Sequence, residues 1–298
     1  MMAQRTIMKL TLTWLYPKLM NIYGDYGNVL TIKKRCEWRG IDLKIIEVGA
    51  GDCVPQNTDL VFMGGGQDFQ QTICAEDLLQ KKDAIFNLVE SEVPALFVCG
   101  GYQLMGHFYH PLTEKEMENF DPEEFGKNFD IETIKTGEYE SKKGADLKGI
   151  GLFDIYTVHF GPAKPRLIGN VALKLNFNLY TQIRSIFQKS STGNRLLETL
   201  VGFENHGGRT YPKNSWTNEL QPLGKIVKGF GNNGEDQTEG AIYKNAIGSY
   251  LHGPILPKNP HLADFLIVKA LKNKSTFDTL QPLDDSLALL AHSTMLAL

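Results

Sequence analysis

A cysteine in the setting of a catalytic nucleophile stands at position 99. The apolar run 95–98 leads directly into Cys99-Gly100-Gly101-Tyr-Gln103, where a helix could begin. A sharp strand-to-helix turn exposes a side chain above a sheet, and adjacent glycines allow the close packing that such a turn needs. A helix N-terminus also favours the thiolate over the thiol. The segment predicts a thiol nucleophile; the alternative is a buried structural cysteine.

Glycines near this turn could supply the backbone N–H groups of an oxyanion hole. The N–H of Gly100, directly after the cysteine, would point at the oxygen of a tetrahedral intermediate. A second donor could come from Gly64, Gly65 or Gly66, which follow the apolar run 59–63. We name Gly65 as the expected second donor.

A thiol nucleophile needs a base, and the sequence has seven histidines. His206 and His252 each close an apolar β-type run beside a glycine, where a pocket would lie. Spacing cannot choose between them, because the partners of a nucleophile are close in space rather than in sequence.

The other three cysteines predict neither disulfides nor a metal site. Cys36, Cys53 and Cys74 form no CxxC pair and lie at no zinc-ligand spacing from a histidine. We expect reduced thiols, mostly buried, and no metal.

Length and composition are those of a folded protein, with about two domains as the prior expectation. The chain has 298 residues, 42% of them hydrophobic, and a formal net charge of −3. Nucleic-acid binders more often carry a basic excess. No apolar run reaches the ~18 residues of a membrane span, and residues 1–8 lack the apolar core of a secretory signal. We expect a soluble cytoplasmic protein.

The elements that must position these residues alternate between strand and helix. We expect strands over 10–15, 41–48, 59–63 and 95–98, helices over 29–38, 78–89 and 102–108, then strands over 151–158, 166–175, 200–204, 224–228 and 241–251, and helices over 261–272 and 286–298. This order predicts an α/β fold with a mostly parallel sheet flanked by helices. Ligands bind beyond the carboxyl ends of such strands, where both glycine-rich turns fall.

Two stretches interrupt the pattern. Residues 110–148 hold eleven acidic residues against six lysines, and we interpret them as a solvated surface insertion with short helices of its own. A polar stretch over 176–197 is a second insertion, and about 275–298 would form a helical tail. The remainder predicts one catalytic domain over 1–298.

Six motifs in chain order resemble those of class I, triad-type glutamine amidotransferases of the cobyric acid synthase branch. They are Tyr23-Gly-Asp-Tyr-Gly-Asn28, Gly64-Gly-Gly-Gln-Asp68, Cys99-Gly-Gly-Tyr-Gln103, Gly202-Phe-Glu-Asn-His-Gly-Gly-Arg-Thr-Tyr211, Gly229-Phe-Gly-Asn-Asn-Gly-Glu-Asp236 and Tyr250-Leu-His-Gly-Pro-Ile-Leu-Pro-Lys-Asn259. The chain is similar in particular to the glutaminase subunits of lipid II isoglutaminyl synthases. The resemblance implies a flavodoxin-like α/β fold.

By this resemblance Cys99 matches the family nucleophile and His252 the general base. Many class I glutaminases carry a Glu two residues after the base, where this sequence has Pro254. The third triad member therefore stays unassigned, with Glu204 as a guess. Phe97 also stands where a small residue is common, which puts the tightness of the turn in question.

The α-carboxylate of glutamine needs a cation, and Arg166 aligns with the family arginine. A guanidinium pairs with a carboxylate through two hydrogen bonds, which favours Arg over Lys. Arg209 is the rival, and a surface charge is the alternative for Arg166.

The resemblance implies hydrolysis of L-glutamine to glutamate and ammonia for a Mur-ligase-like partner, MurT, in a heterodimer. That partner would amidate the D-glutamate α-carboxylate of lipid II in peptidoglycan synthesis. The chain has no GxxxxGK[ST] phosphate loop, so we expect no cofactor here and ATP and Mg²⁺ on the partner. The alternatives are a glutaminase for cobyric acid-type amidation, a non-catalytic glutamine sensor and another thiol hydrolase.

Overall fold

The computed structural model describes residues 8–134, 146–187, 198–274, 277 and 279–298. Its largest sheet has seven strands, which run in the order β11 (Leu220–Gln221), β14 (Ala241–Tyr243), β15 (Ala246–Ser249), β4 (Ala95–Val98), β3 (Leu60–Met63), β1 (Lys9–Leu15) and β2 (Asp42–Val48). The five strands from β15 to β2 are parallel, and β14 and β11 extend the sheet antiparallel. The prediction of a mostly parallel α/β sheet is confirmed.

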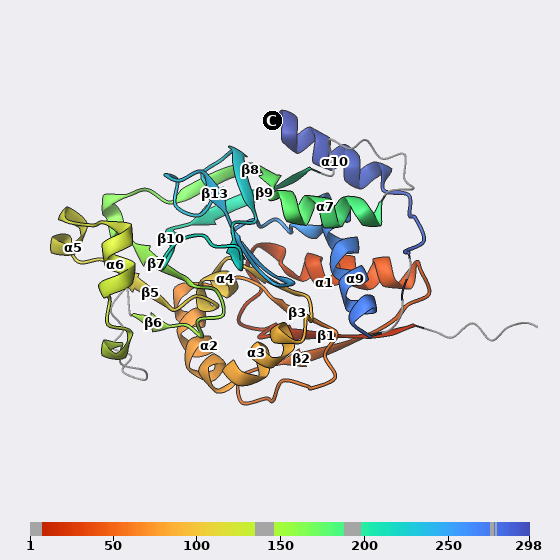
Figure 1. The fold of residues 1–298 in the computed structure, drawn as a ribbon, viewed down its shortest axis with the longest axis horizontal. Helices are drawn as coiled ribbons and strands as arrows, with labels where there is room; N and C mark the ends of the chain where they lie inside the picture. Colours follow the sequence, from red (N-terminus) through yellow and green to blue (C-terminus); the bar gives the residue numbers. More distant parts are fainter. Residues whose placement is uncertain (1–7, 135–145, 188–197, 275–276, 278) are drawn as a thin grey trace, which may run out of the picture.

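Helices cover both faces of this sheet. Strand β2 is added on one side of β1, and β3 and β4 are added on its other side. Right-handed connections therefore place α1 (Tyr26–Glu37) on one face of the sheet and α2 (Asp68–Gln80) and α3 (Lys82–Glu90) on the other. Helix α9 (Pro260–Lys274) packs beside α1 (Figure 1). The helix expected over 78–89 is in fact two helices that meet at Lys81.

The first expected insertion has an aromatic core instead of being a solvated excursion. Its described part forms α5 (Glu114–Glu118), α6 (Pro122–Asn128) and a 3-10 turn, η2 (Ile131–Thr133). These elements pack onto a second sheet of β10 (Gly208–Pro212), β7 (Ile155–His159), β5 (Phe108–Pro111) and β6 (Leu147–Lys148). Phe125 and Phe129 contact the buried ring of Phe108, Phe125 also contacts Tyr156, and Phe120 contacts Tyr211. Residues 135–145 of the insertion lie outside the described residues.

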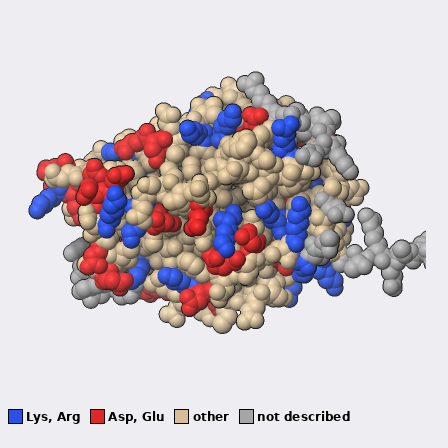
Figure 2. All heavy atoms as spheres, in the orientation of Figure 1, with Lys and Arg blue, Asp and Glu red and all other residues tan. Residues whose placement is uncertain are grey.

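The outer surface of these short helices is acidic. Residues 112–134 hold eight carboxylates against two lysines. Figure 2 shows the red side chains gathered at the end of the molecule where Figure 1 places α5 and α6. The insertion is therefore packed on its inner side and negatively charged on its outer side.

A third sheet completes the fold. It consists of β13 (Thr238–Glu239), β12 (Gly224–Lys228), β8 (Leu167–Leu175) and β9 (Thr199–His206), and all its neighbours are antiparallel. The polar stretch expected as a second insertion contains α7 (Phe177–Ile186), and 188–197 lies outside the described residues. The expected tail helix is α10 (Ser286–Ala297). No helix in the described part of the chain has the length and apolarity that crossing a membrane requires.

Candidate active site

Four neighbouring parallel strands end at the candidate site. Asp25 follows β1, Gly65 follows β3, Cys99 follows β4 directly, and His252 follows β15. A methyl group at Gly65 would lie 3.0 Å from His252 Cε1 and 3.1 Å from Cys99 Cβ. Parallel strands place their carboxyl ends on one edge, so residues far apart in sequence meet there.

Cys99 occupies a strained turn between β4 and the short helix α4 (Gly100–Leu104). Its φ is +52° and its ψ is −110°, a conformation that non-glycine residues rarely adopt. The Cys99 N–H donates to the Ser249 carbonyl at 2.8 Å, which ties the turn to β15. A Cβ at Gly101 would lie 2.7 Å from the Gly64 carbonyl oxygen, so only glycine fits. Phe97 is fully buried two residues earlier, so a large residue there is compatible with the turn.

His252 is fully buried, and β9 holds its backbone. Two backbone hydrogen bonds join it to Phe203, at 2.7 and 3.2 Å. Its ring lies between the Cys99 thiol and the carboxylate of Asp25. Burial opposes the protonated ring, but the cysteine and the carboxylate outweigh burial and raise the pKa of His252 to about 10.

Asp25 is the acidic partner that sequence reasoning missed. Its side chain is fully buried; Oδ1 lies 3.4 Å from His252 Nδ1, and Oδ2 accepts the Gly65 N–H at 2.7 Å. The signal was present in Tyr23-Gly-Asp-Tyr-Gly-Asn28, but 227 positions separate this aspartate from the histidine. No local pattern could pair them.

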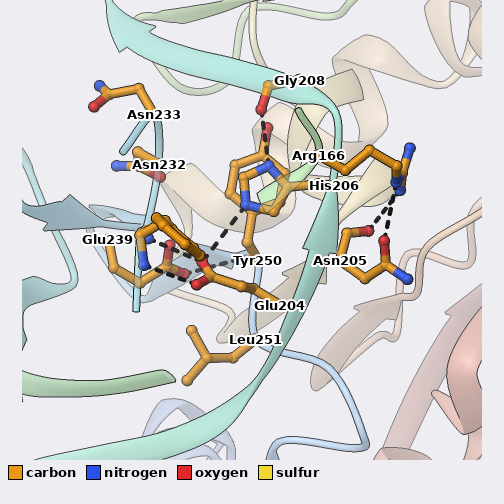
Figure 3. A network of polar contacts seen from close by, with 12 residues as sticks. Arg166, Glu204, Asn205, His206, Gly208, Asn232, Asn233, Glu239, Tyr250 and Leu251 are labelled. Carbon is orange, nitrogen blue, oxygen red and sulfur yellow. Dashed lines mark hydrogen bonds and ion pairs between the residues drawn. The ribbon is translucent and has the colours of Figure 1, made fainter. Parts of the chain in front are cut away.

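Glu204, the earlier guess for the third member, faces a different histidine. It accepts the backbone N–H groups of Phe230 and Gly231, and its Oε2 lies 3.8 Å from His206 Nε2 (Figure 3). His206 stacks on Tyr250 with ring centroids 3.6 Å apart. Burial lowers the pKa of His206, so it stays neutral.

Gly65, the expected second oxyanion donor, gives its N–H to Asp25. One short hydrogen bond thus engages this N–H, and the oxyanion role of Gly65 stays a prediction. The neighbouring Gly66 nitrogen lies 3.1 Å from the place that a Cβ on Gly100 would occupy. The Gly66 nitrogen therefore lies close to Gly100, the residue that follows Cys99.

Arg166 lines the same cavity of about 450 Å³ as Cys99. Asn205 orients its guanidinium twice: Nε donates to Asn205 Oδ1 at 3.0 Å, and Nη2 donates to the Asn205 carbonyl at 2.9 Å (Figure 3). The rival Arg209 is buried and donates to the carbonyls of Gly207 and Pro165. The Arg209 guanidinium thus holds two backbone segments together through these hydrogen bonds.

The described residues contain no cluster of three or more His, Cys, Asp or Glu that could hold a metal ion. The arrangement instead unites a thiol, a histidine that favours its protonated form, a buried carboxylate and a cationic pocket wall. It is suited to nucleophilic attack on a carbonyl of a substrate that carries a carboxylate.

Comparison with known proteins places this site in a family context. The model of the CobB/CobQ-like glutamine amidotransferase domain matches residues 11–260. The lipid II isoglutaminyl synthase (glutamine-hydrolyzing) subunit GatD of Streptococcus pneumoniae is 35% identical over 268 residues, which cover 89% of this chain and 82% of that protein. The GatD subunit of Staphylococcus aureus is 31% identical over 256 residues, covering 86% of this chain and 82% of that protein.

A more distant similarity extends to a longer protein. The cobyric acid synthase of Listeria innocua is 28% identical over 199 residues, covering 66% of this chain and 29% of that protein. Both identity and coverage are lower than for the GatD subunits.

Proposed function

Because this chain belongs to the CobB/CobQ-like glutamine amidotransferase family, we propose that it hydrolyses L-glutamine to glutamate and ammonia as the glutaminase subunit of a lipid II isoglutaminyl synthase. The observation that carries the proposal is the strained Cys99 turn beside the buried His252 and Asp25. Such a constellation activates a thiol for acyl transfer.

In the proposed mechanism the Cys99 thiolate attacks the side-chain amide carbon of glutamine. The protonated His252 ring gives its proton to the leaving nitrogen, so ammonia departs and a γ-glutamyl thioester remains. The now neutral ring takes a proton from water, which attacks the thioester and releases glutamate and the thiolate. Asp25 holds the ring in position and stabilises its charge, a role supported by their 3.4 Å contact.

The negative oxygen formed in both steps needs hydrogen-bond donors. We assign this role to the N–H groups of Gly66 and Gly100, because the Gly66 nitrogen lies close to Gly100 and Gly100 directly follows Cys99. Removing one such donor from a hydrolase typically costs ~10²–10³ in rate.

Recognition of glutamine is assigned to the wall of the same cavity. Arg166 would bind the α-carboxylate, with its guanidinium oriented by Asn205. Gln103 lines the cavity and donates from Nε2 to Tyr250 Oη at 3.0 Å. Its carbonyl oxygen is then an acceptor suited to the α-ammonium group.

The ammonia would be used by a Mur-ligase-like partner subunit, MurT, that holds ATP and Mg²⁺. The GatD relatives support this over cobyric acid-type amidation, since they are more similar and the match extends over 82% of their length. The pair would amidate the D-glutamate of lipid II at the cytoplasmic side of the membrane, and so affect peptidoglycan and cell shape. The heterodimer is part of the proposal.

Ammonia release from glutamine by the full chain, co-expressed with its ligase partner, tests the function. Cys99→Ala removes the nucleophile, so ammonia release should fall to background. Cys53→Ala is the matched control, because this exposed cysteine lies outside the site and should leave the rate unchanged. Unchanged ammonia yield from Cys99→Ala would refute the assignment. Turnover of glutamine by wild type also separates the proposal from a non-catalytic sensor.

A further inference from the structure

We propose that Gly27, Asn28 and Pro254 form a positioning clamp that holds the Asp25 turn against the His252 segment and so sets the Asp25–His252 contact. The proposal rests on the proposed function and deepens it, since it assigns roles to residues of the Tyr23-Gly-Asp-Tyr-Gly-Asn28 motif that the mechanism leaves unused. The clamp joins the start of α1 to the chain that follows the catalytic histidine.

The first half of the clamp is a buried hydrogen bond. The Asn28 side chain is fully buried, and its Oδ1 accepts the Leu256 N–H at 2.9 Å. The Asn28 N–H donates to the Asp25 carbonyl at 2.9 Å, which fixes the turn that carries the carboxylate. Leu256 is four residues beyond His252, so one side chain links the acid-bearing turn to the base-bearing segment.

The second half is a steric contact. A Cβ at Gly27 would lie 2.4 Å from Pro254 Cγ and 3.2 Å from Pro254 Cβ, so the proline ring occupies the place of a side chain. The φ of Gly27 is ordinary, so proximity is the reason that glycine stands there. Pro254 stands at the position where many class I glutaminases carry a Glu. Here that position supports the carboxylate of another element instead of supplying one.

The Asp25–His252 contact, which the clamp sets, can lengthen very little before it is lost. At 3.4 Å the Asp25–His252 separation is already longer than the usual 2.7–3.2 Å of such bonds. Asp25 Oδ2 is held on its other side by the Gly65 N–H at 2.7 Å. A shift of α1 away from Pro254 would therefore break the contact with His252 first.

Variants that add and remove atoms at the contact test the clamp in the full chain with its ligase partner. Gly27→Ala should lower kcat for glutamine hydrolysis by about 10²-fold, the scale of a 1 Å misplacement, with KM nearly unchanged because Arg166 is untouched. Pro254→Ala removes the Cγ and Cδ atoms that the new methyl would meet. The double variant should therefore recover most of the loss. Gly169→Ala is the control, because a Cβ there meets nothing within 4 Å.

The Asp25→Asn background separates positioning from general folding. If Gly27 acts through Asp25, then Gly27→Ala should cost nothing further once the carboxylate is absent. Loss of activity by the same factor in both backgrounds, or no recovery in the double variant, would overturn the clamp. Asn28→Ala should behave as Gly27→Ala does, with a lower kcat and an unchanged KM.

A second readout does not depend on glutamine turnover. The rate of Cys99 alkylation by iodoacetamide at pH 7, in a Cys53→Ala background, reports the thiolate that the His252 charge supports. Gly27→Ala should slow alkylation and Pro254→Ala should restore it. If wild type releases no ammonia but alkylation follows this pattern, the proposed function fails and the clamp stands. An alkylation rate that is unchanged in Gly27→Ala would refute the clamp itself.

Discussion

Two oxygens of a single carboxylate serve two parts of the site. Asp25 Oδ1 faces His252, and Oδ2 holds the Gly65 N–H that starts the glycine loop. The carboxylate therefore stabilises the charged imidazole and fixes the loop that places Gly66 beside Gly100. A single buried residue thus couples His252 to the glycine loop that we propose as part of the oxyanion hole.

Replacing this carboxylate should change the pH dependence of hydrolysis. The Cys99 and Asp25 charges raise the pKa of His252 to about 10 against the opposing effect of burial. Asp25→Asn removes one raising contribution, so the pKa of His252 falls and the alkaline limb of kcat/KM moves to lower pH. We expect kcat to fall by about 10²-fold or more. A pH–rate profile from pH 6 to 11 measures both effects.

Glu204 provides the contrasting variant. It lies near His206 and accepts two backbone N–H groups, so Glu204→Gln should leave the alkaline limb in place. A shift of the limb in Glu204→Gln and none in Asp25→Asn would contradict the assignment of the acidic partner.

At the scale of elements, a buried charge cluster joins α1, α9 and the segment before α10. Arg35 forms two hydrogen bonds to Asp264, at 2.6 and 2.8 Å, and Arg39 forms a third at 2.7 Å. Arg35 also pairs with Asp285, which precedes α10. Of the four charged side chains, Arg35, Arg39 and Asp264 are at most 7% exposed, and only Asp285 is more exposed. The cluster anchors α1, the helix that Asp25 directly precedes.

Removing the central carboxylate should destabilise the whole fold. Asp264→Ala leaves two buried guanidinium groups with fewer partners, which costs about 3–5 kcal/mol of unfolding free energy in comparable cases. Urea unfolding, followed by circular dichroism, measures this loss of unfolding free energy. Glu37→Ala is the control; its ion pair with Lys34 is exposed, so the midpoint should hardly move. An equal, small shift in both variants would show that the cluster adds no stability.

At the scale of the whole molecule, the insertion that includes α5 and α6 combines an aromatic inner face with an acidic outer face. Its rings cover Phe108, Tyr156 and Tyr211 of the second sheet, whose strands continue to the active-site cavity. Its exposed carboxylates are separate from that core. The two faces can therefore be altered independently.

Deleting residues 112–134 should expose the aromatic surface and disturb the fold. We expect a lower melting temperature and binding of an apolar dye, because buried rings would meet water. Changing Glu118, Glu123 and Glu124 to Gln should leave the melting temperature near that of wild type, since these carboxylates are exposed. A deletion variant as stable as wild type would show that the aromatic core is dispensable. Only the Gln variant can test contact between the acidic face and a ligase partner.

Much of the central fold follows from local patterns. The strand 95–98 and the parallel core of the sheet agree with expectation because short apolar runs bounded by turns are typical of buried strands. The two small sheets could not be predicted from local patterns, because antiparallel pairs such as β8–β9 join strands that a segment of polar sequence separates. The packed insertion was also missed, because its aromatic residues follow no regular period.

The amino-acid sequence by itself determined which chemistry is available. Residue type and local spacing point to Cys99 in its glycine-flanked turn, and the resemblance of the motifs to a known family adds His252 and Arg166 as the candidate base and cation. Only the tertiary structure decided that Asp25 meets His252, that Asp25 holds the Gly65 N–H, and that Pro254 packs against Gly27. The Asp25–His252 and Gly27–Pro254 contacts each join residues 227 positions apart, where the order of the strands in the sheet, and not sequence spacing, sets which side chains touch.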